Sequence, residues 1–289
     1  MNFNNLVTQT YNKSAKIIRD FFHPGTDGDH FLEGRGFFSR GWSKLVRPFK
    51  GHESIVRYSF DKGNDIRADI SNKYSFTGDL LDIYANHKDS IIHKWHHYLP
   101  IYDRYFSKYR GTQVRFLEIG VSKGGSLAMW RKYLGPDAII YGIDVDESCR
   151  VYDGVHGNVR IGSQDDPDFL ASVISEMGGV DLILDDGSHR MWHVKKSLEI
   201  LFPMLSMGGA YMIEDLHTAY WVTHGGGLRS RNNFYIYLRE LIDDLHRWYH
   251  PGPVNHKVTA ESLTSLHVYD SIVVLEKNVC HAPVHSMVP

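Results

Sequence analysis

The sequence predicts an α/β protein built on a doubly wound, mostly parallel sheet. From residue 114 onward, short apolar runs of strand type alternate with longer stretches of helical periodicity. The apolar runs are nearly continuous, as in strands that helices cover on both faces of a sheet. The 289 residues, 42% of them hydrophobic, are enough for one large domain with an extension.

The expected elements follow in order along the chain. Apolar residues at helical spacing predict helices at 80–84 and 98–106, ahead of the sheet. Apolar runs predict seven strands, at residues 114–119, 138–143, 159–162, 180–184, 209–213, 266–269 and 272–276. Amphipathic stretches predict the other helices, at residues 127–134, 168–177, 194–202 and 233–249. Only Asp270 and Ser271 separate the last two strands, which predicts an antiparallel pair that closes the sheet.

The first 76 residues differ from the rest in composition and in hydrophobic periodicity. Residues 11–22 have apolar residues at helical spacing, which predicts an amphipathic helix. Residues 31–67 are rich in Gly, aromatic and basic residues and show no sustained period. We expect residues 1–76 to form a mainly helical and loop extension that acts as a lid or an oligomer contact. Surface loops packed against a core are an equally good interpretation.

Composition narrows the class of protein. The chain has 32 Lys and Arg against 34 Asp and Glu, a net charge of -2, which argues against a dedicated nucleic-acid binder. We expect no membrane span, because no apolar run reaches the length of about 18–20 residues that a bilayer requires. Residues 1–5 do not resemble a signal peptide. Two cysteines cannot form a disulfide framework, and this favours a cytoplasmic location.

A glycine-bearing loop follows the first predicted strand. Glycines at 120, 124 and 125 let backbone N–H groups approach a ligand closely where the chain enters a helix. The spacing is not the G-x-G-x-x-G of dinucleotide-binding proteins. Glu118, two residues before Gly120, suits a ligand with a cationic amino group better than a pyrophosphate. The alternative is an ordinary strand-to-helix turn.

The second and third strands also end in polar residues. Asp144, 24 positions after Gly120, is placed to accept hydrogen bonds from two ribose hydroxyls, a feature that serves NAD and S-adenosylmethionine equally. After the third strand, Gln164 and its acidic neighbours are candidates for contact with an adenine edge. Asp166, directly before Pro167, is equally well suited to cap the following helix.

Acidic residues gather after strands four and five. Asp185 and Asp186 follow one strand, and Glu214 and Asp215 follow the next. Four carboxylates converging at the carboxyl ends of strands repel one another unless a cation lies between them or their pKa values rise. Oxygen ligands without Cys suit Mg²⁺, Mn²⁺ or Ca²⁺. His189, three residues past Asp186, is placed to act as a general base there. A helix cap or solvated turn is the alternative for any one of these carboxylates.

The histidines at 93, 96 and 97 are a weaker signal. They include an i,i+4 pair, but no third ligand pattern is near in sequence. We expect a packed or cleft-lining aromatic patch there rather than a zinc site.

These segments together resemble the class I S-adenosylmethionine-dependent methyltransferases. More narrowly, the chain resembles the metal-dependent sugar O-methyltransferases of macrolide and rhamnosyl-antibiotic biosynthesis, over about residues 77–277. The resemblance is carried, in order, by residues 117–120 with 124–127, 141–144, 164 with 166–167, 185–189, 213–216 with 218–221, and 269–273. It implies a Rossmann-like, seven-stranded methyltransferase domain over residues 77–289.

The resemblance also implies roles for individual residues. It places S-adenosylmethionine against Glu118, Gly120, Ser126, Asp144, Ser163, Gln164, Asp166 and Asp185. It assigns Mg²⁺ or Mn²⁺ to Asp186, Glu214 and Asp215, with His189 as catalytic base. The chain departs from the family at Ser163, where an acidic residue is often found.

The implied function is a Mg²⁺-dependent O-methyltransferase for a hydroxyl of a sugar, a glycosylated natural product or a polysaccharide. The expected partner is a small-molecule or glycan acceptor, with homo-oligomer formation through the extension. One alternative is a methyltransferase for a catechol-like or other vicinal-oxygen acceptor. Further alternatives are a nicotinamide-dependent oxidoreductase or epimerase and a non-catalytic nucleoside-binding protein.

Overall fold

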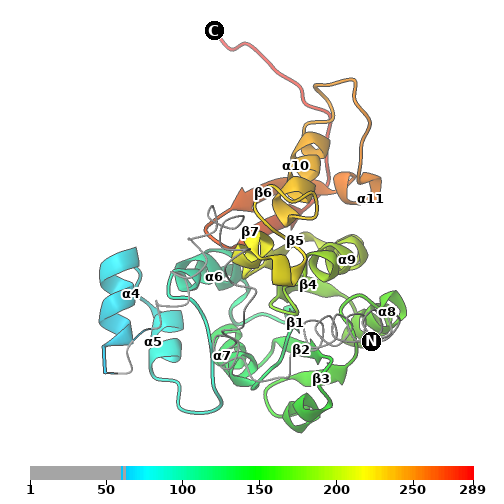
Figure 1. The fold of residues 1–289 in the computed structure, drawn as a ribbon. Coiled ribbons are helices and arrows are strands. Elements are labelled where there is room, and N and C mark those ends of the chain that lie inside the picture. The colour runs from blue at the N-terminus through cyan, green and yellow to red at the C-terminus, as the bar shows by residue number, and fades with distance from the viewer. Residues whose placement is uncertain (1–59, 61–62) are drawn as a thin grey trace, which may run out of the picture. The chain divides into compact units, whose positions relative to one another are not determined.

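A seven-stranded mixed sheet organises the computed structural model, which describes residue 60 and residues 63–289 (Figure 1). The strands are β1 (Arg115–Ile119), β2 (Ile139–Asp144), β3 (Asn158–Ile161), β4 (Val180–Asp185), β5 (Leu205–Ile213), β6 (Leu263–Val268) and β7 (Val273–Lys277). Their order across the sheet is β3-β2-β1-β4-β5-β7-β6. Strands β1 to β5 pair in parallel, whereas β7 runs antiparallel to both β5 and β6. The predicted fold class and the closing antiparallel pair are confirmed.

Helices cover both faces of this sheet. The α-helices are α4 (Ile66–Tyr74), α5 (Asp79–Ala85), α6 (Tyr98–Phe106), α7 (Gly125–Leu134), α8 (Pro167–Met177), α9 (Met191–Leu201), α10 (Phe234–Leu245) and α11 (Lys257–Ala260). Short 3₁₀ helices are η2 (Ser107–Tyr109), η3 (Glu147–Tyr152), η4 (Phe202–Met204), η5 (Leu216–Tyr220) and η6 (Val222–His224). Figure 1 shows α5, α6 and α7 on one side of the sheet and α8 and α9 on the other.

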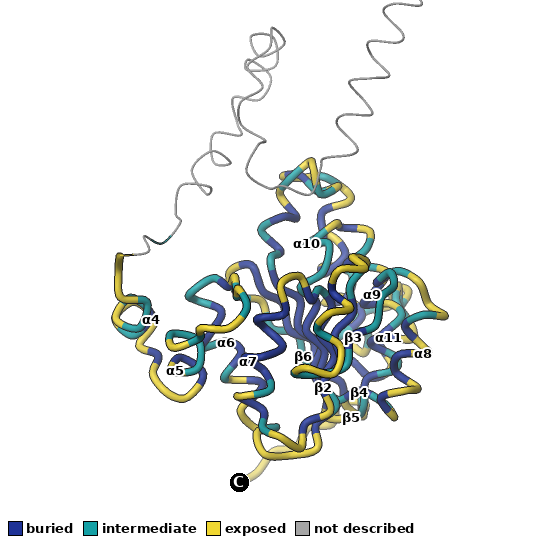
Figure 2. The backbone as a smooth tube through the Cα atoms, turned by 90° about the horizontal axis from the view of Figure 1, so that it is seen from below, coloured by how far each residue is buried: buried dark blue, intermediate teal, exposed yellow. Residues whose placement is uncertain are grey.

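Alternating strand residues build two apolar cores. Phe116 of β1 packs with helices α5, α6 and α7, while its neighbours Leu117 and Ile119 pack with α8 and α9. Side chains point alternately to the two faces of a strand, so a strand covered on both faces must be apolar throughout. Figure 2 shows the strands as the most continuously buried part of the backbone, between helices that are exposed on their outer sides.

Local signals set the helix ends. Asp166 accepts hydrogen bonds from the backbone N–H of Asp168 and of Phe169, so it caps α8, and Pro167 occupies the first helical position. Gly178, with φ of 76°, ends the same helix in the left-handed conformation. Asn233 caps α10 in the same manner as Asp166 caps α8.

Several boundaries differ from the predicted ones. Strand β5 begins at Leu205, four residues early, and α10 ends at Leu245 rather than at residue 249. The compact unit runs from Asp65 to Pro289 and so includes α4, which lies before the boundary expected at residue 76. The helix predicted over residues 11–22 lies outside the described residues.

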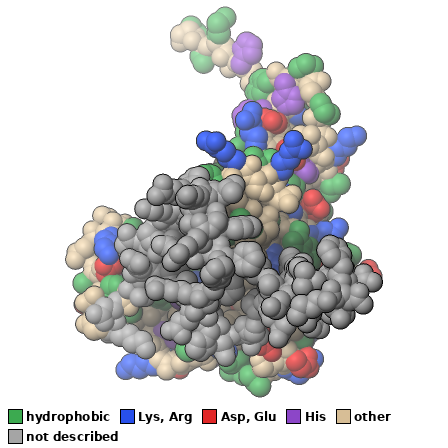
Figure 3. All heavy atoms as spheres, in the orientation of Figure 1, with side chains coloured by type: hydrophobic (Ala, Val, Ile, Leu, Met, Phe, Trp, Pro, Cys, Tyr) green, Lys and Arg blue, Asp and Glu red, His purple; other side chains and the backbone are tan. Residues whose placement is uncertain are grey.

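The described part of the chain has no helix with both the length and the apolar character needed to cross a membrane. Figure 3 shows basic and acidic side chains interspersed on the described part of one face. This mixture agrees with the near balance of charges in the sequence.

Candidate active site

A cavity of about 400 Å³ opens at the carboxyl ends of the parallel strands. Its wall includes residues that follow each of β1 to β5 and a segment that precedes α6, namely residues 91–94, 119–123, 126, 143–145, 162–164, 186–189, 193 and 215. Ligands of open α/β sheets bind at this edge. The cavity is therefore the place to look for a ligand site.

The loop after β1 approaches the loop after β4 closely. Gly120 has φ of 96°, and a Cβ atom built there would lie 2.1 Å from the carbonyl oxygen of Asp186. Only glycine fits this position without a backbone shift. Asp144, at the end of β2, accepts hydrogen bonds of 2.9 Å from the backbone N–H groups of Val121 and Ser122. Its carboxylate thus holds the glycine loop while facing the cavity.

Two carboxylates and an imidazole meet where β4 and β5 end. His189 Nε2 lies 3.6 Å from Asp186 Oδ1 and 3.7 Å from Asp215 Oδ2. One ligand atom from each of these three residues lies within 4.8 Å of the others, and no second such group occurs among the described residues. The carboxylate oxygens of Asp186 and Asp215 fit a divalent cation such as Mg²⁺ or Mn²⁺, and the imidazole of His189 lies beside them.

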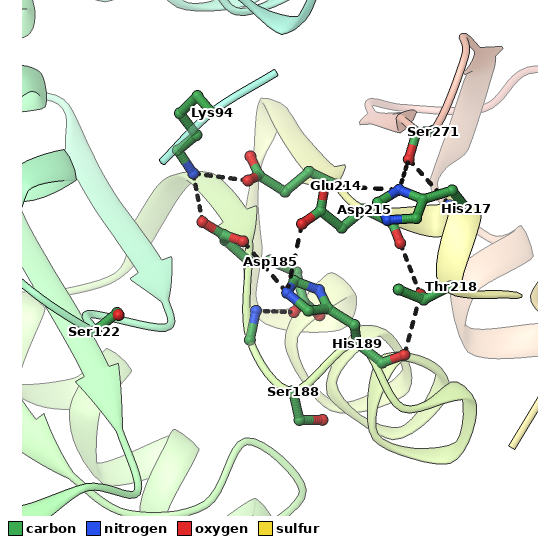
Figure 4. Close-up of polar contacts among 12 residues, drawn as sticks. Lys94, Ser122, Asp185, Ser188, His189, Glu214, Asp215, His217, Thr218 and Ser271 are labelled. Carbon is green, nitrogen blue, oxygen red and sulfur yellow. Dashed lines mark hydrogen bonds and ion pairs between the residues drawn. The ribbon is translucent and has the colours of Figure 1, made fainter. Parts of the chain in front are cut away.

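The backbone at this site is held in an uncommon conformation. His189 and Asp215 have φ of 54° and 56°, in the left-handed region that non-glycine residues seldom adopt. Thr218 Oγ1 lies 2.7 Å from the carbonyl oxygen of Asp215 and 3.2 Å from that of His189 (Figure 4). The hydroxyl therefore ties the two strained turns together.

Lys94 reaches the acidic cluster, formed by Asp186, Glu214 and Asp215, from a different part of the chain. Its Nζ atom donates a hydrogen bond of 2.7 Å to Glu214 Oε1 (Figure 4). It donates another to Asp186 Oδ2. Tyr102 of α6 donates to Glu214 Oε2, and Tyr98 donates to Asp215 Oδ1 at 2.7 Å. Sequence reasoning missed Lys94, because no motif links it to residues more than ninety positions away.

Burial and mutual repulsion shift the acidic groups. Burial, together with the charge of Asp215, raises the pKa of Asp186 to about 6 although Lys94 opposes the shift. Burial and the charge of Asp186 raise the pKa of Glu214 well above its ordinary value. Burial raises the pKa of Asp215 too, but His189 and Tyr98 outweigh it, so this pKa is lowered. The increase in pKa expected for converging carboxylates is therefore found at Asp186 and Glu214, and not at Asp215.

Of the residues predicted to bind the metal, the structure brings Asp186 and Asp215 together with His189. Glu214 lies beside Asp186, but Lys94 and Tyr102 occupy its two carboxylate oxygens. The predicted cofactor residues that line the cavity are Gly120, Ser126, Asp144, Ser163 and Gln164. Gln164 also joins two loops, because its Oε1 accepts from the backbone N–H of Ser188 at 2.8 Å.

Three other predicted cofactor residues lie away from the cavity wall. Glu118 is fully buried, where its carboxylate accepts from Ser126 Oγ at 2.9 Å and Trp130 Nε1 at 3.1 Å. Asp185 is also buried and accepts hydrogen bonds from Ser197, Tyr211 and Gln164. Asp166 caps α8, the alternative noted for it.

The histidines at 93, 96 and 97 do not converge on one another as a metal group within the described residues. His93 lines the cavity, His96 contacts Asp69 at 2.7 Å, and His97 contacts the carbonyl oxygen of Asp270 at 3.2 Å.

Comparison with known proteins identifies relatives. Residues 117–216 match the family model described as a methyltransferase domain. The chain is 38% identical, in an alignment of 250 residues that covers 80% of this chain, to the 8-demethyl-8-(2-methoxy-alpha-L-rhamnosyl)-tetracenomycin-C 3'-O-methyltransferase of Streptomyces olivaceus. It is 37% identical, in an alignment of 194 residues that covers 63% of this chain, to the mycinamicin VI 2''-O-methyltransferase of Micromonospora griseorubida. It spans 60% and 48% of these relatives, respectively.

Solved structures of the MycE methyltransferase from the mycinamycin biosynthetic pathway have the same fold. The structure in complex with Mg and SAH aligns with a TM-score of 0.60 and 30% identity, covering 82% of this chain and 60% of that chain. The structure in complex with Mg, SAH and mycinamycin VI aligns with a TM-score of 0.61 and 28% identity, covering 89% and 66%.

Proposed function

We propose, from the match of residues 117–216 to a methyltransferase domain and from the relatives named above, that this chain is a class I, S-adenosylmethionine- and Mg²⁺-dependent O-methyltransferase acting on a sugar hydroxyl. The acceptor is a sugar, a glycosylated natural product or a polysaccharide. The observation that carries the proposal is the group formed by Asp186, His189 and Asp215 beside the cavity that Gly120 and Asp144 line. The Streptomyces olivaceus relative is named as a methyltransferase of a rhamnosyl-bearing compound, which supports this acceptor class.

Asp144 and the glycine loop are proposed to hold the nucleoside of S-adenosylmethionine. Asp144 accepts three hydrogen bonds from backbone N–H groups, including one from Asp146 at 2.9 Å. A carboxylate offers about four acceptor sites, so capacity remains for one ribose hydroxyl. Ser163 and Gln164 line the neighbouring wall and are proposed to face the adenine.

Asp186 and Asp215 are proposed to hold the divalent cation, which, when bound, lowers the pKa of an acceptor hydroxyl and fixes its orientation. We assign the general base to His189, whose Nε2 atom lies beside both carboxylates. Its role is to take the hydroxyl proton as the acceptor oxygen bonds to the methyl carbon and the sulfur–carbon bond breaks. The rest of the site then has to keep oxygen, carbon and sulfur in line, which contributes up to about 7–11 kcal/mol in favourable cases.

The roles proposed for Glu118, Asp166 and Asp185 change with their positions. We propose that all three act by shaping the loops around the cofactor. Glu214 is retained as a candidate metal ligand, because its carboxylate adjoins Asp186.

The test uses the full chain stripped of metal with EDTA. Calorimetry should show binding of S-adenosylmethionine and S-adenosylhomocysteine but not of NAD. Methyl transfer to a panel of sugars and glycosides should require Mg²⁺ or Mn²⁺, with catechols as the competing acceptors. Preference for catechols would favour the vicinal-phenol alternative, and activity that persists in EDTA would overturn the proposal.

Two further proposals concern the chain as a whole. We propose that residues 1–76 serve as a lid or an oligomer contact, which light scattering of the full chain tests. We expect the reaction to occur in the cytoplasm, since both Cys149 and Cys280 are free thiols, which suits a reducing compartment.

A further inference from the structure

Lys94 is buried against the acidic cluster rather than exposed at its rim. Its side chain is 1% exposed, and the Glu214 side chain beside it is 2% exposed. The ammonium group reaches carboxylates from the loops after β4 and β5, and it lies 5.8 Å from the ring centre of Tyr102. A buried ammonium is costly unless it is paired and hydrogen-bonded, and here it contacts two acidic groups.

The charges around Lys94 explain why a fixed cation is needed. Asp186, Glu214 and Asp215 lie together at the ends of two adjacent strands, with Asp185 and Ile213 paired in the sheet just before them. His189 and His217 also adjoin Asp215, but an imidazole is cationic only when it is protonated. Within the described residues Lys94 is the one lysine or arginine side chain that pairs with these acids.

A second buried lysine shows that burial alone does not produce this arrangement. Measured over the whole residue rather than the side chain, Lys277 of β7 is as exposed as Lys94, 6% in each case. Its Nζ atom donates to the carbonyl oxygens of Phe202 and Pro203, at 3.2 and 2.6 Å. Lys277 therefore donates hydrogen bonds to backbone carbonyl groups at the end of a helix, whereas Lys94 donates to carboxylates of the candidate metal site.

We propose that Lys94 is a positioning residue, the internal counter-ion that keeps Asp186 and Glu214 together before a divalent cation binds. The inference rests on the metal site of the proposed function. Asp186 lines the cavity and divides its carboxylate, with Oδ2 toward Lys94 and Oδ1 toward His189. The ammonium thus orients one oxygen for a cation and reduces repulsion within the cluster. It also opposes the charge of that cation, and so limits its affinity.

The proposal is tested by metal binding and unfolding of the full chain. Lys94→Met keeps the apolar stem but removes the charge, so in metal-free buffer the melting temperature should fall by on the order of 10 °C. Saturating Mn²⁺ should restore much of this loss, giving a larger metal-induced rise than in the wild type. The same variant should bind Mn²⁺ about tenfold more tightly, measured from the spin-resonance signal of the free ion.

Lys277→Met is the matched control. It should also lower the melting temperature, but its Mn²⁺-induced rise should equal that of the wild type. A structural role for Lys94 would make the two variants alike in this respect. A metal-induced rise in Lys94→Met that is equal to or smaller than the wild-type rise would overturn the proposal.

A metal-free comparison separates this inference from the proposed function. Lys94→Met/Glu214→Gln removes both members of a charge pair, so it should be more stable than Lys94→Met alone, and should fold if the single variant does not. A double variant that is no more stable would also overturn the counter-ion role. Failure of the wild type to bind Mn²⁺ would instead overturn the metal site, and leave the metal-free comparison to decide the role of Lys94.

Discussion

The Nε2 atom of His189 lies 3.7 Å from Oδ2 of Asp215, although the two residues follow different strands. Both residues have left-handed backbone conformations, and Thr218 contacts the carbonyl oxygen of each. Strain of this kind persists only where the surroundings fix it, and it is concentrated at functional sites. The imidazole is therefore held beside the carboxylates by the backbone and not by its side chain alone.

His189→Ala should abolish most turnover while keeping cofactor affinity. Loss of a general base lowers kcat by about 10²–10⁴-fold, and the cavity residues that face the nucleoside stay unchanged. Single-turnover methyl transfer and calorimetry with S-adenosylhomocysteine measure the two effects. His256→Ala is the control, because His256 pairs with Glu240 at 2.9 Å outside the site.

Mn²⁺ binding by His189→Ala separates a base from a metal ligand. Unchanged Mn²⁺ affinity with lost turnover supports the base, and a large loss of Mn²⁺ affinity would reassign His189 as a ligand. Wild-type turnover would remove it from the mechanism.

Asp144→Ala should weaken S-adenosylhomocysteine binding by about 10–100-fold, the usual range for hydrogen bonds to a charged group. The substitution removes the acceptor for the N–H groups of Val121 and Ser122 as well as the proposed ribose contact. Mn²⁺ affinity should not change. Asp146→Ala is the control, since Asp146 accepts from Ser148 N and caps η3. Equal binding by the Asp144 variant and the wild type would refute the ribose assignment.

Most of the fold was predictable because strands covered on both faces have an unmistakable apolar pattern. The start of β5 was not, since its segment contains glycines at 208 and 209, which weaken a strand signal. Helix α4 was missed because it is short and carries one buried residue, Ile70. Its packing on α5, rather than its own periodicity, stabilises it.

The placement of the candidate site residues was predictable where loops follow strands and unpredictable where strand residues alternate faces. Glu118 and Asp185 are the last or nearly last residues of β1 and β4, where helices α7 and α9 still cover the sheet. Their side chains therefore find Trp130 and Ser197 on these helices instead of the cavity. Lys94 is joined to Asp186 only by the tertiary fold, so no local spacing reveals it.

Gly120→Ala should destabilise the protein and weaken cofactor binding together. The new Cβ atom would meet the carbonyl oxygen of Asp186, a backbone atom that can move only if the loop after β4 moves with it. We expect a loss of on the order of 3 kcal/mol in the free energy of unfolding. Gly178→Ala is the matched control, because Gly178 also has positive φ but has nothing within 4 Å of a Cβ position. It should cost only about 1 kcal/mol and leave cofactor affinity unchanged. Equal losses in urea unfolding would show that steric contact at Gly120 is unimportant.

Glu118 should make the stability of the protein fall as pH rises from about 4.5 to about 7. Burial raises the pKa of this fully buried carboxyl from 4.5 to about 7, although Lys94 and the hydrogen bond from Ser126 oppose the shift. The folded state then binds more protons than the unfolded state across this window. The contribution of Glu118 to the free energy of unfolding is therefore complete below its unfolded pKa and is lost as pH rises through its folded pKa. The change corresponds to roughly 3 kcal/mol.

Glu118→Gln should remove this slope, so that the difference in unfolding free energy between variant and wild type moves in favour of the variant as pH rises. Urea unfolding between about pH 3 and 8 measures it, a range that also covers the titration of the control below. Glu276→Gln is a control of opposite sign. Burial raises the pKa of Glu276, but hydrogen bonds from Ser265 and His267 outweigh it, so this pKa is lowered and its stabilisation is lost as pH falls. If the free energies of unfolding of Glu118→Gln and the wild type ran parallel with pH, the pKa of Glu118 would be the same in the folded and unfolded states. Its burial would then not raise its pKa.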